Sequence, residues 1–307
     1  MNKLSVVISA YNEERNIEDC LKSAKELADE LIVIDNCSTD KTPEIAKRYA
    51  KVFEQENNPN KIDVQKNFGF SKATGDWILS LDADERLTPE LSREIKSVIS
   101  NQSSVIGYWI PRKNIIFGKW IKSEMWWPDY QLKLFRKGKG KYEEGVHKAL
   151  QVDGETEKLE TPIVHHNYVS IHQYLQKLNT YTDIEAKTLV KEGYKFNWLD
   201  SIRFPLNDFL KTFFLQKGYR DGIHGLVLSM FQGFYMGIVF AKLWEKEGFK
   251  DVESEDFVKE VKKEFKNSAA KIRYWIVSTL IDETKNPVTK AILKASRRIT
   301  SYKIKSS

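Results

Sequence analysis

The 307-residue sequence contains only two cysteines, Cys20 and Cys37, which form neither a disulfide framework nor the ligand spacing of a zinc site. A reducing compartment such as the cytosol is therefore the simplest expectation. The N-terminal segment MNKLSVVISAYNEE runs directly into a predicted strand, and its apolar part is too short for the h-region of a secretory signal peptide.

Motifs of three large enzyme classes are also missing. The first apolar run leads into Ser-Ala-Tyr-Asn-Glu-Glu rather than Gly-x-Gly-x-x-Gly, which argues against a Rossmann dehydrogenase. The sequence has no Walker-type Gly-Lys-Ser/Thr loop for phosphoryl transfer and no Gly-x-Ser-x-Gly elbow for Ser/His/Asp hydrolysis. Because 41% of the residues are hydrophobic and 30% are charged, we nevertheless expect a soluble globular protein with a substantial core.

Strand and helix signals alternate over the first hundred residues, which predicts an α/β sheet with parallel strands. The predicted strands are residues 4–9, 30–34, 52–53 and 77–81, and helices are predicted between and after them, with Thr42 and Thr88 as N-caps before Pro43 and Pro89. Residues 107–166 have the texture of strands rich in aromatic side chains, which either line an acceptor pocket or belong to the core.

Polar turns follow three of these predicted strands. Asp35 follows the run LIVI, Asp82 and Asp84 follow WILSL, and the SAYNEE turn follows LSVVI. Because open α/β sheets bind ligands outside the carboxyl ends of their strands, we expect the three turns to line one cleft. The alternative, that each acid only caps the next helix, suits Asp40 but not the sequence Asp82-Ala83-Asp84.

The Asp82-Ala83-Asp84 sequence is also a candidate metal site. Two carboxylates one residue apart can hold Mg²⁺ or Mn²⁺, whose remaining positions take diphosphate oxygens and water. An ion held in this way acts as a Lewis acid that offsets the charge on a departing nucleoside diphosphate.

Three segments, LSVVISAYNEERNIEDCLKSA, ELIVIDNCSTDKTPEIA and KNFGFSKATGDWILSLDADERLTPEL, resemble the family 2 glycosyltransferases in order and spacing. The resemblance covers residues 3–95. The stretch DYQLKLFRKGKGKYEEGVHKAL and residues 162–168 extend it toward the branch that contains lipopolysaccharide-core β-1,4-glucosyltransferases. It implies a GT-A nucleotide-diphospho-sugar transferase fold over residues 1–165 and a helical C-terminal region over residues 166–307.

The resemblance also implies roles for individual residues. Asp35 would accept a hydrogen bond from the uracil N3–H of a UDP-sugar, although a dTDP-sugar would satisfy it almost as well. Asp82 would face the ribose and diphosphate, and Asp84 would be the main protein ligand of the Mg²⁺ or Mn²⁺ ion. The residues implied to bind the nucleotide sugar are Ala10, Tyr11, Glu13, Asp35, Lys66, Asn67, Asp82 and Ala83, and the implied metal ligands are Asp82 and Asp84.

An inverting transfer needs a carboxylate that takes the proton of the acceptor hydroxyl as its oxygen attacks the anomeric carbon. Asp129 best matches the position of this base in the family. Glu143 and Glu144 are rival candidates, and the remaining alternative is that Asp129 only caps a turn.

The residue that follows His147 departs from the family pattern. Relatives in the narrower branch often have an acid after the histidine of the VH motif, whereas Lys148 follows His147 here, so the donor or acceptor preference is expected to differ. His147, His165 and His166 are candidates for a further metal or phosphate contact, or are ordinary loop or core histidines.

Beyond residue 171 the sequence is expected to be almost entirely helical. Residues 222–241 carry no Asp, Glu, Lys or Arg, and this length suits a membrane span. Four glycines, His224 and Gln232 favour an interfacial or re-entrant helix instead, with burial against other helices as the alternative.

The last part of the chain, residues 257–307, is strongly basic. It holds thirteen Lys/Arg and four Asp/Glu, a local charge of +9. This charge suits anionic lipid headgroups, or it is a solvated basic surface. No motif for specific nucleic-acid binding accompanies it, so only weak, salt-sensitive binding of nucleic acid would be expected.

Together these features predict a metal-dependent inverting glycosyltransferase that moves a hexose from a UDP-sugar to a glycan or lipid-linked acceptor in cell-envelope polysaccharide or lipopolysaccharide synthesis. The expected location is the cytoplasm, peripherally on the inner face of the membrane. Two rival interpretations remain: a transferase that acts directly on polyprenyl phosphate, and a non-catalytic nucleotide-sugar-binding scaffold on the same fold.

Overall fold

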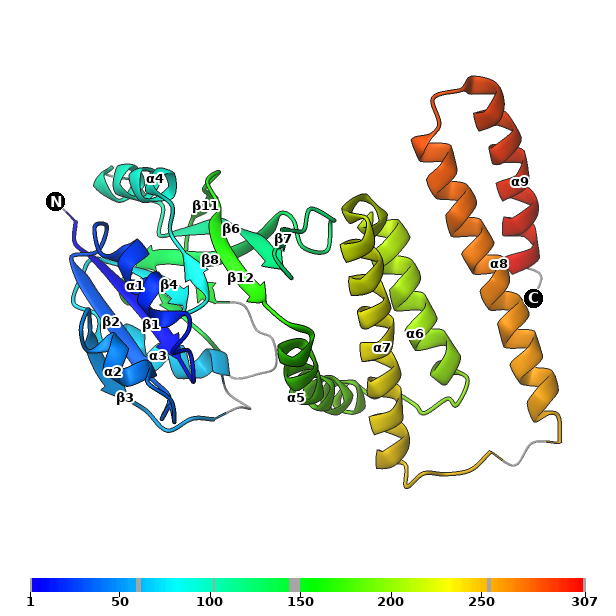
Figure 1. Cartoon of the computed structure of the whole chain (residues 1–307), viewed down its shortest axis with the longest axis horizontal. Helices are drawn as coiled ribbons and strands as arrows, with labels where there is room; N and C mark the ends of the chain where they lie inside the picture. Colours follow the sequence, from blue (N-terminus) through cyan, green and yellow to red (C-terminus); the bar gives the residue numbers. More distant parts are fainter. Residues whose placement is uncertain (1, 59–61, 102, 144–149, 253–254, 306–307) are drawn as a thin grey trace. The chain divides into compact units, whose positions relative to one another are not determined.

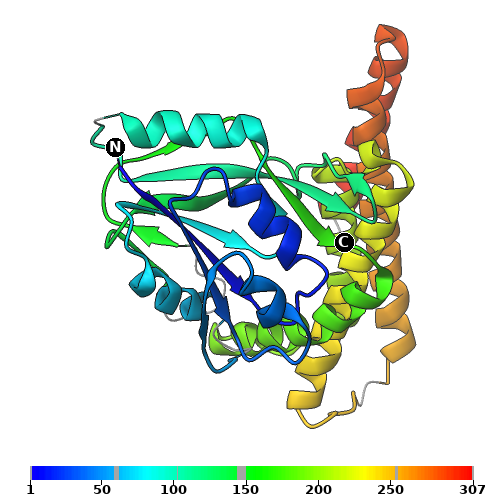
Figure 2. The same cartoon turned by 60° about the vertical axis from the view of Figure 1, so that its left-hand side comes forward.

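The computed structural model describes residues 2–58, 62–101, 103–143, 150–252 and 255–305 (Figures 1 and 2). It divides into two compact units, the first formed by Met1–Ile121 and Trp126–Val169 and the second by Lys122–Met125 and Ser170–Ser307. The sequence placed the division after residue 165, but the last strand of the first unit continues to Tyr168 because it stays paired with its neighbour up to that residue.

A mixed sheet forms the centre of the first unit. In the described residues it has ten strands, with the order β3-β2-β1-β4-β8-β6-β12-β5, and β7 and β11 pair with β6 outside this path. The strands are β1 (Leu4–Ala10), β2 (Glu30–Asp35), β3 (Lys51–Glu54), β4 (Trp77–Asp82), β5 (Glu85–Arg86), β6 (Gly107–Ile116), β7 (Lys119–Trp120), β8 (Asp129–Arg136), β11 (Thr156–Lys158) and β12 (Ile163–Tyr168). A separate ribbon pairs β9 (Gly140–Lys141) with β10 (Gln151–Val152).

The N-terminal half of the sheet is parallel, as the sequence predicted: β3, β2, β1 and β4 all run in one direction. Helices cover both of its faces (Figure 2). Helices α1 (Ile17–Ala24), α2 (Thr42–Ala46) and α4 (Pro89–Ser100) share one apolar core with the sheet, and α3 (Ile62–Lys72) shares the other. This two-sided cover explains why β1 is buried along nearly its whole length.

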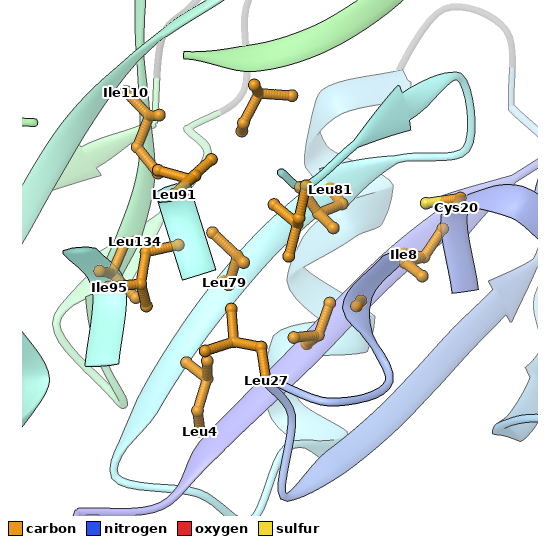
Figure 3. Packing of buried hydrophobic residues seen from close by; sticks show 14 of the residues in the cluster. Leu4, Ile8, Cys20, Leu27, Leu79, Leu81, Leu91, Ile95, Ile110 and Leu134 are labelled. Atoms are coloured by element: carbon orange, nitrogen blue, oxygen red, sulfur yellow. The ribbon is translucent and has the colours of Figure 1, made fainter. Parts of the chain in front are cut away.

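Figure 3 shows the larger of these cores. Leu4 and Ile8 of β1 lie on the same side of the sheet as Leu79 of β4, and Cys20 and Leu91 come from the helices that cover them. The Cys20 side chain is fully buried, and burial raises the pKa of its thiol, so Cys20 acts as a small apolar core residue.

The two predicted helix caps have different outcomes. Thr88 caps α4, because its Oγ1 accepts a hydrogen bond from the Leu91 N–H at 3.2 Å. The expectation for Thr42 is wrong: Thr42 is the first residue of α2 and not its N-cap. Asp40 takes the capping role, since its Oδ1 accepts from the Thr42 N–H at 2.9 Å.

The C-terminal half of the sheet is largely antiparallel. β8 runs antiparallel to β4, so β8 begins beside the carboxyl end of β4. β6 pairs with β8 and places Arg112 opposite Asp129, while β12 pairs with β6 and places His165 opposite Asn114. β5 then pairs with β12, with Glu85 opposite His165. These pairings carry side chains from distant parts of the sequence to one edge of the sheet.

The second unit is helical in the described residues. Its helices are α5 (Ile171–Lys191), α6 (Asp200–Leu210), α7 (Ile223–Lys246), α8 (Phe257–Glu283) and α9 (Pro287–Lys305), with a π-helical turn at Lys211–Leu215 and a 3₁₀ turn at Gly218–Asp221 between α6 and α7. α7 contains most of the predicted uncharged segment. Among the described residues it is the one helix long and apolar enough to cross a membrane, judged by length and composition alone, and 28% of its most apolar window is buried.

Candidate functional site

The carboxyl ends of three parallel strands place the acidic residues that the sequence singled out. β1 and β2 pair Ala10 with Asp35, and β1 and β4 pair Ser9 with Asp82. Asp35 is the last residue of β2 and Asp82 is the last residue of β4. The predicted convergence of these strand ends is therefore present in the fold.

Two loops that leave this edge hold each other in place. The backbone N–H of Asn12 donates to Ser38 Oγ at 2.9 Å, and Asn12 Oδ1 accepts from the Thr39 N–H at 2.8 Å. The Glu13 N–H donates to Thr42 Oγ1 at 2.7 Å. The loop after β1 and the loop after β2 thus form one rigid rim above Asp35.

Asp35 has a carboxylate oxygen that is available to a ligand. The side chain is only 4% exposed, and its Oδ2 accepts a hydrogen bond from the Ser38 N–H at 3.1 Å. Its Oδ1 is buried and has no hydrogen-bond partner in the described part of the chain. Because an unsatisfied buried acceptor costs roughly 1–3 kcal/mol, this oxygen suits an N–H or O–H donor from a ligand.

Asp82 has the opposite surroundings, since an ammonium group binds each of its oxygens. Lys66 Nζ lies 2.7 Å from Oδ1 and Lys133 Nζ lies 2.8 Å from Oδ2. Lys133 also contacts the fully buried Glu85 at 2.6 Å, and Glu85 in turn accepts from the Asp82 N–H. Burial alone would raise the pKa of Asp82, but Lys133 and Lys66 outweigh it and hold that pKa well below its usual range.

Asn114 fixes the protonation of His165. The Asn114 Nδ2 atom donates to the Trp126 carbonyl at 3.0 Å and to Asp129 Oδ2 at 3.2 Å. Both partners can only accept, so the amide oxygen must be the atom that faces His165 Nδ1 at 2.6 Å. His165 therefore carries a proton on Nδ1, and its Nε2 lies 3.5 Å from Asp84 Oδ1.

Asp129 is held firmly by its neighbours. Arg112 contacts Oδ2 through two nitrogens, at 2.6 and 2.7 Å, and Gln131 Nε2 donates to Oδ1 at 2.7 Å. Burial raises the pKa of Asp129, but the charge of Arg112 and the bonds from Gln131 and Asn114 lower it below the usual value. Asp129 is therefore ionised at neutral pH and is a weak base in this arrangement.

The remaining predicted residues lie around the same edge or near it. Ala10 and Ala83 are buried in the larger core, whereas the Tyr11 ring is 46% exposed. Glu13 Oε2 accepts from Asn16 Nδ2 at 2.7 Å, which supports the start of α1. Asn67 exchanges two hydrogen bonds with the Tyr142 backbone, at 2.8 and 2.9 Å, so its amide holds the segment around Tyr142.

The remaining candidate acids and histidines are Glu143, Glu144, His147 and His166. Glu143 is exposed, and Glu144 and His147 lie outside the described residues. His166 donates its backbone N–H to the Asp84 carbonyl at 2.9 Å. Burial is the main cause that lowers the pKa of the His166 imidazole, which favours its neutral form.

Four functional residues at this edge were missed by the sequence analysis: Lys133, Glu85, Arg112 and Asn114. Lys133 stands at an alternating position in a strand, where it carries no recognisable motif. Lys133 reaches Asp82 only because β8 pairs with β4 in the sheet. The one available signal was a charged residue inside the apolar run LKLF, because an unpaired lysine would not be buried there.

A divalent cation fits some of these residues better than others. The described residues contain no group of three or more His, Cys, Asp or Glu side chains that could hold a metal by themselves. Magnesium is commonly held by one or two carboxylates together with substrate phosphates. Asp84 Oδ1 and His165 Nε2 offer an oxygen and a nitrogen to such an ion, whereas both oxygens of Asp82 already accept from lysines.

A surface cavity of about 610 Å³ lies at the opposite end of the parallel strands and is lined by Lys3, Glu30, Lys51 and neighbouring residues. Glu30 is already bonded there to Ser5, Thr74 and Lys51. The cavity therefore has no unsatisfied acid and lies at the wrong end of the strands for ligand binding in an α/β sheet. The candidate site is therefore the edge of the sheet that carries Asp35, Asp82 and Asp129, and not this cavity.

Comparisons with known proteins identify the family of the chain. The family model described as glycosyl transferase family 2 matches residues 5–150. An uncharacterized glycosyltransferase of Rickettsia typhi is 34% identical over 260 residues, which cover 80% of this chain and 88% of that protein. The lipopolysaccharide core biosynthesis glycosyltransferase LpsC of Rhizobium meliloti is 25% identical over 80% of this chain and 94% of its own length. A crystal structure of S. aureus TarS 1-349 in complex with UDP-GlcNAc covers 76% of this chain and 81% of that chain at 17% identity, with a TM-score of 0.44.

Proposed function

Because the chain belongs to glycosyl transferase family 2, and is accordingly a glycosyltransferase of the GT-A fold, we propose that it moves a hexose from a UDP-sugar to a glycan or lipid-linked acceptor with inversion at the anomeric carbon. The observation that carries the proposal is the unsatisfied buried Asp35 Oδ1, at the same sheet edge as Asp82 and Asp129. One edge thus offers an acceptor for a base, charged groups for a diphosphate and a carboxylate for proton transfer.

The nucleotide part of the donor is proposed to lie over the rim above Asp35. Asp35 Oδ1 accepts the uracil N3–H, with Ala10 and the exposed Tyr11 ring beside the base. A thymine base presents the same N3–H, so a dTDP-sugar is the nearest alternative donor. Lys66 contacts Asp82 at this edge, and its ammonium group suits the ribose-proximal phosphate.

A divalent cation is proposed at Asp84, with His165 as a further ligand. When bound, Mg²⁺ or Mn²⁺ supplies Lewis-acid stabilisation of the departing diphosphate. Asp82 is better suited to anchoring Lys66 and Lys133 next to the phosphates than to ligating the ion, because the ammonium groups already bind both of its oxygens. Asn114 keeps the Nε2 lone pair of His165 directed at Asp84.

The transfer itself is proposed as a single displacement. The acceptor hydroxyl oxygen forms a bond to the anomeric carbon while the bond from that carbon to the diphosphate oxygen breaks. The hydroxyl proton passes to Asp129, which is ionised because of Arg112. Arg112 binds Oδ2 of Asp129, so Oδ1, which accepts the neutral bond from Gln131, is the oxygen proposed to meet the acceptor hydroxyl.

The acceptor is proposed to belong to the cell envelope. The similarity to LpsC, a lipopolysaccharide core biosynthesis glycosyltransferase, favours a lipopolysaccharide core or a related lipid-linked glycan. Such acceptors are held in a membrane, so we place the protein in the cytoplasm with peripheral contact to the inner face of that membrane. The second unit, with its basic C-terminal helices, is the part suited to this contact.

Transfer assays with the full-length protein test this proposal. UDP release from UDP-hexoses is measured with Mn²⁺ and a truncated lipopolysaccharide acceptor, and NMR of the product reports the anomeric configuration. Asp84→Ala should lower turnover by several orders of magnitude, while the exposed Asp153→Ala serves as the control. Near-normal turnover of Asp84→Ala, or retention of configuration, would contradict the proposal.

One substitution separates the proposal from its rivals. Removing a general base costs roughly 10²- to 10⁴-fold, so Asp129→Asn should lose at least a hundredfold in kcat with a hydroxyl acceptor. A polyprenyl phosphate acceptor needs no strong base, and an Asp129→Asn variant with normal turnover on that lipid would favour the first rival. UDP binding without turnover on any acceptor would favour the scaffold.

A further inference from the structure

Helix α8 exposes a continuous apolar stripe. Its members and their exposed fractions are Val258 at 76%, Phe265 at 58%, Ile272 at 37%, Ile276 at 43% and Leu280 at 50%. Their spacing of seven and four residues keeps them on one face of the helix over more than twenty residues. A stripe of large side chains of this length is more than the scattered exposure that ordinary surfaces show.

The stripe is not the face by which α8 packs within its unit. Glu264 and Ser268 are buried, and Glu264 forms an ion pair with Arg203 of α6 at 2.8 Å. Val277 and Ile281 are buried as well. The helix is therefore anchored by other faces, and its apolar stripe is left in solvent.

Cations border the stripe on one side. Lys262 lies a helical turn from both Val258 and Phe265, and Arg273 lies a turn from Ile276; Lys266 falls between them on the same side. All three cations are exposed. Glu264 is buried in its pair with Arg203, Glu260 lies on another face of α8, and Asp282 is in the last turn of the helix. Glu283 lies at the C-terminal end of the stripe, three residues beyond Leu280, where it contacts Arg220 and Tyr219.

We propose that this face of α8, an apolar stripe bordered by Lys262, Lys266 and Arg273, lies in the plane of an anionic lipid surface. Helices that bind at membrane interfaces combine these two features, because the apolar side chains enter the acyl boundary while the cations meet the headgroups. The inference deepens the proposed function, since it names the surface that brings the enzyme to a lipid-linked acceptor. It does not depend on which sugar is transferred.

Other occupants suit the face less well. A twofold interface built on the stripe would bring the three cations of both copies together, and Glu283, the acid of α8 on that face, already pairs with Arg220. A nucleic acid would use the cations but leave Phe265 and Ile276 in water. Helix α7 also exposes apolar residues, among them Met230 and Phe234, but that stretch of α7 carries no Lys or Arg beside them. Charge complementarity therefore favours lipid at α8.

Co-sedimentation of the full-length protein with phosphatidylcholine vesicles, with and without phosphatidylglycerol, tests the inference. Binding is expected only with phosphatidylglycerol and should weaken with added salt. Reversing Lys262, Lys266 and Arg273 to Glu should lower the partition coefficient by about a hundredfold or more, since each cation near the surface contributes roughly fivefold. Replacing Phe265, Ile272 and Ile276 by Gln should lower it by more than tenfold.

Matched variants separate the face from general effects. Reversing the exposed Lys187, Lys191 and Lys195 changes the net charge equally and should leave binding within about threefold, because these lysines lie off the α8 face. Replacing Met230 and Phe234 of α7 by Gln should have a similarly small effect. Thermal unfolding and UDP binding of every variant report folding and the donor site, so loss of vesicle binding is distinguishable from failure of the proposed activity.

Three results would overturn the inference. The first is equal binding to neutral and anionic vesicles. The second is a normal partition coefficient for either α8 variant, or a loss caused by the α7 variant alone. The third is a dimer in sedimentation equilibrium that the Phe265, Ile272 and Ile276 replacements dissociate, with no vesicle binding by the original chain, because the stripe would then be a contact between copies.

Discussion

Asp35 and Asp82 end the two strands that flank β1 in the sheet, yet their carboxylates have opposite surroundings. Asp82 is paired with Lys66 and Lys133, whereas Asp35 Oδ1 is buried without a hydrogen-bond partner in the described part of the chain. The difference follows from the surroundings of each strand end and not from the residue type. Substitutions that remove single charges test these assignments.

Replacing Asp35 by Asn should weaken UDP binding by roughly 10- to 100-fold, because a hydrogen bond to an ionised acceptor is worth about 1.5–3 kcal/mol. Titration calorimetry with UDP measures the change. Asp29→Asn is the matched control, since Asp29 Oδ2 accepts from the Leu4 N–H at the other end of the strands. Equal effects of the two substitutions on UDP affinity would remove Asp35 from the site.

The pH profile tests Asp129 as the base. Arg112 lowers the pKa of Asp129, so the acid limb of kcat/KM is expected below the ordinary pKa of aspartate. Arg112→Gln should move this limb upward by roughly one to three pH units, because the neighbouring positive charge is lost. The sign follows from the ionised form being the active one. An acid limb that stays unmoved in Arg112→Gln would contradict the role of Asp129.

Among single residues, the sequence predicted the acids and missed their partners. Asp35, Asp82 and Asp84 follow strong apolar runs, and such runs predict where a strand ends. Lys133 and Asn114 lie inside strands, and their roles depend on which strands become neighbours. That order is set by pairing between segments far apart in the chain, which local patterns do not encode.

At the scale of elements, the position of α3 depends on a close approach to the sheet. A Cβ atom at Gly69 would lie 2.6 Å from Val7 Cγ1 and 2.8 Å from Ile34 Cγ1. Only glycine allows the helix to pack at this distance. Because Lys66 and Asn67 are on the same helix, this packing also sets their position at the site.

Gly69→Ala should destabilise the fold by about 1–3 kcal/mol, as overpacking of a well-packed core does. Urea unfolding measures the free energy. Gly237→Ala is the matched control, because a Cβ there meets only Pro205 Cγ at 3.5 Å and alanine is favoured by up to about 1 kcal/mol inside a helix. A neutral Gly69→Ala would show that the close approach is not needed.

Most helices and strands of the first hundred residues could be predicted from the sequence. The strands that follow could be recognised as strand-like, but their bounds and pairing could not be predicted. The parallel strands and the cap at Thr88 follow from local signals. The antiparallel half of the sheet was recognisable only as strand-like, because β6, β8 and β12 pair across long sequence separations. The apolar stripe of α8 was hidden by the many lysines around it.

At the scale of the whole molecule, the candidate site and the basic, apolar surface of α8 lie in different units of the chain. The unit that carries Asp35, Asp84 and Asp129 holds the site, and the helical unit carries the excess positive charge and the exposed apolar stripe of α8. The central claim is that the strand ends bind a uridine nucleotide together with a divalent cation.

Thermal unfolding with UDP, dTDP, GDP and ADP, each with and without Mn²⁺, tests that claim most directly. A ligand that binds only the folded state at a hundredfold excess over its Kd stabilises it by about 2.7 kcal/mol. The account predicts that UDP, and to a lesser extent dTDP, raises the Tm by several degrees when Mn²⁺ is present, and that Asp84→Ala abolishes the Mn²⁺-dependent part. A Tm that no nucleotide changes would mean that the family motifs persist without their ligand, and the scaffold interpretation would replace the enzyme.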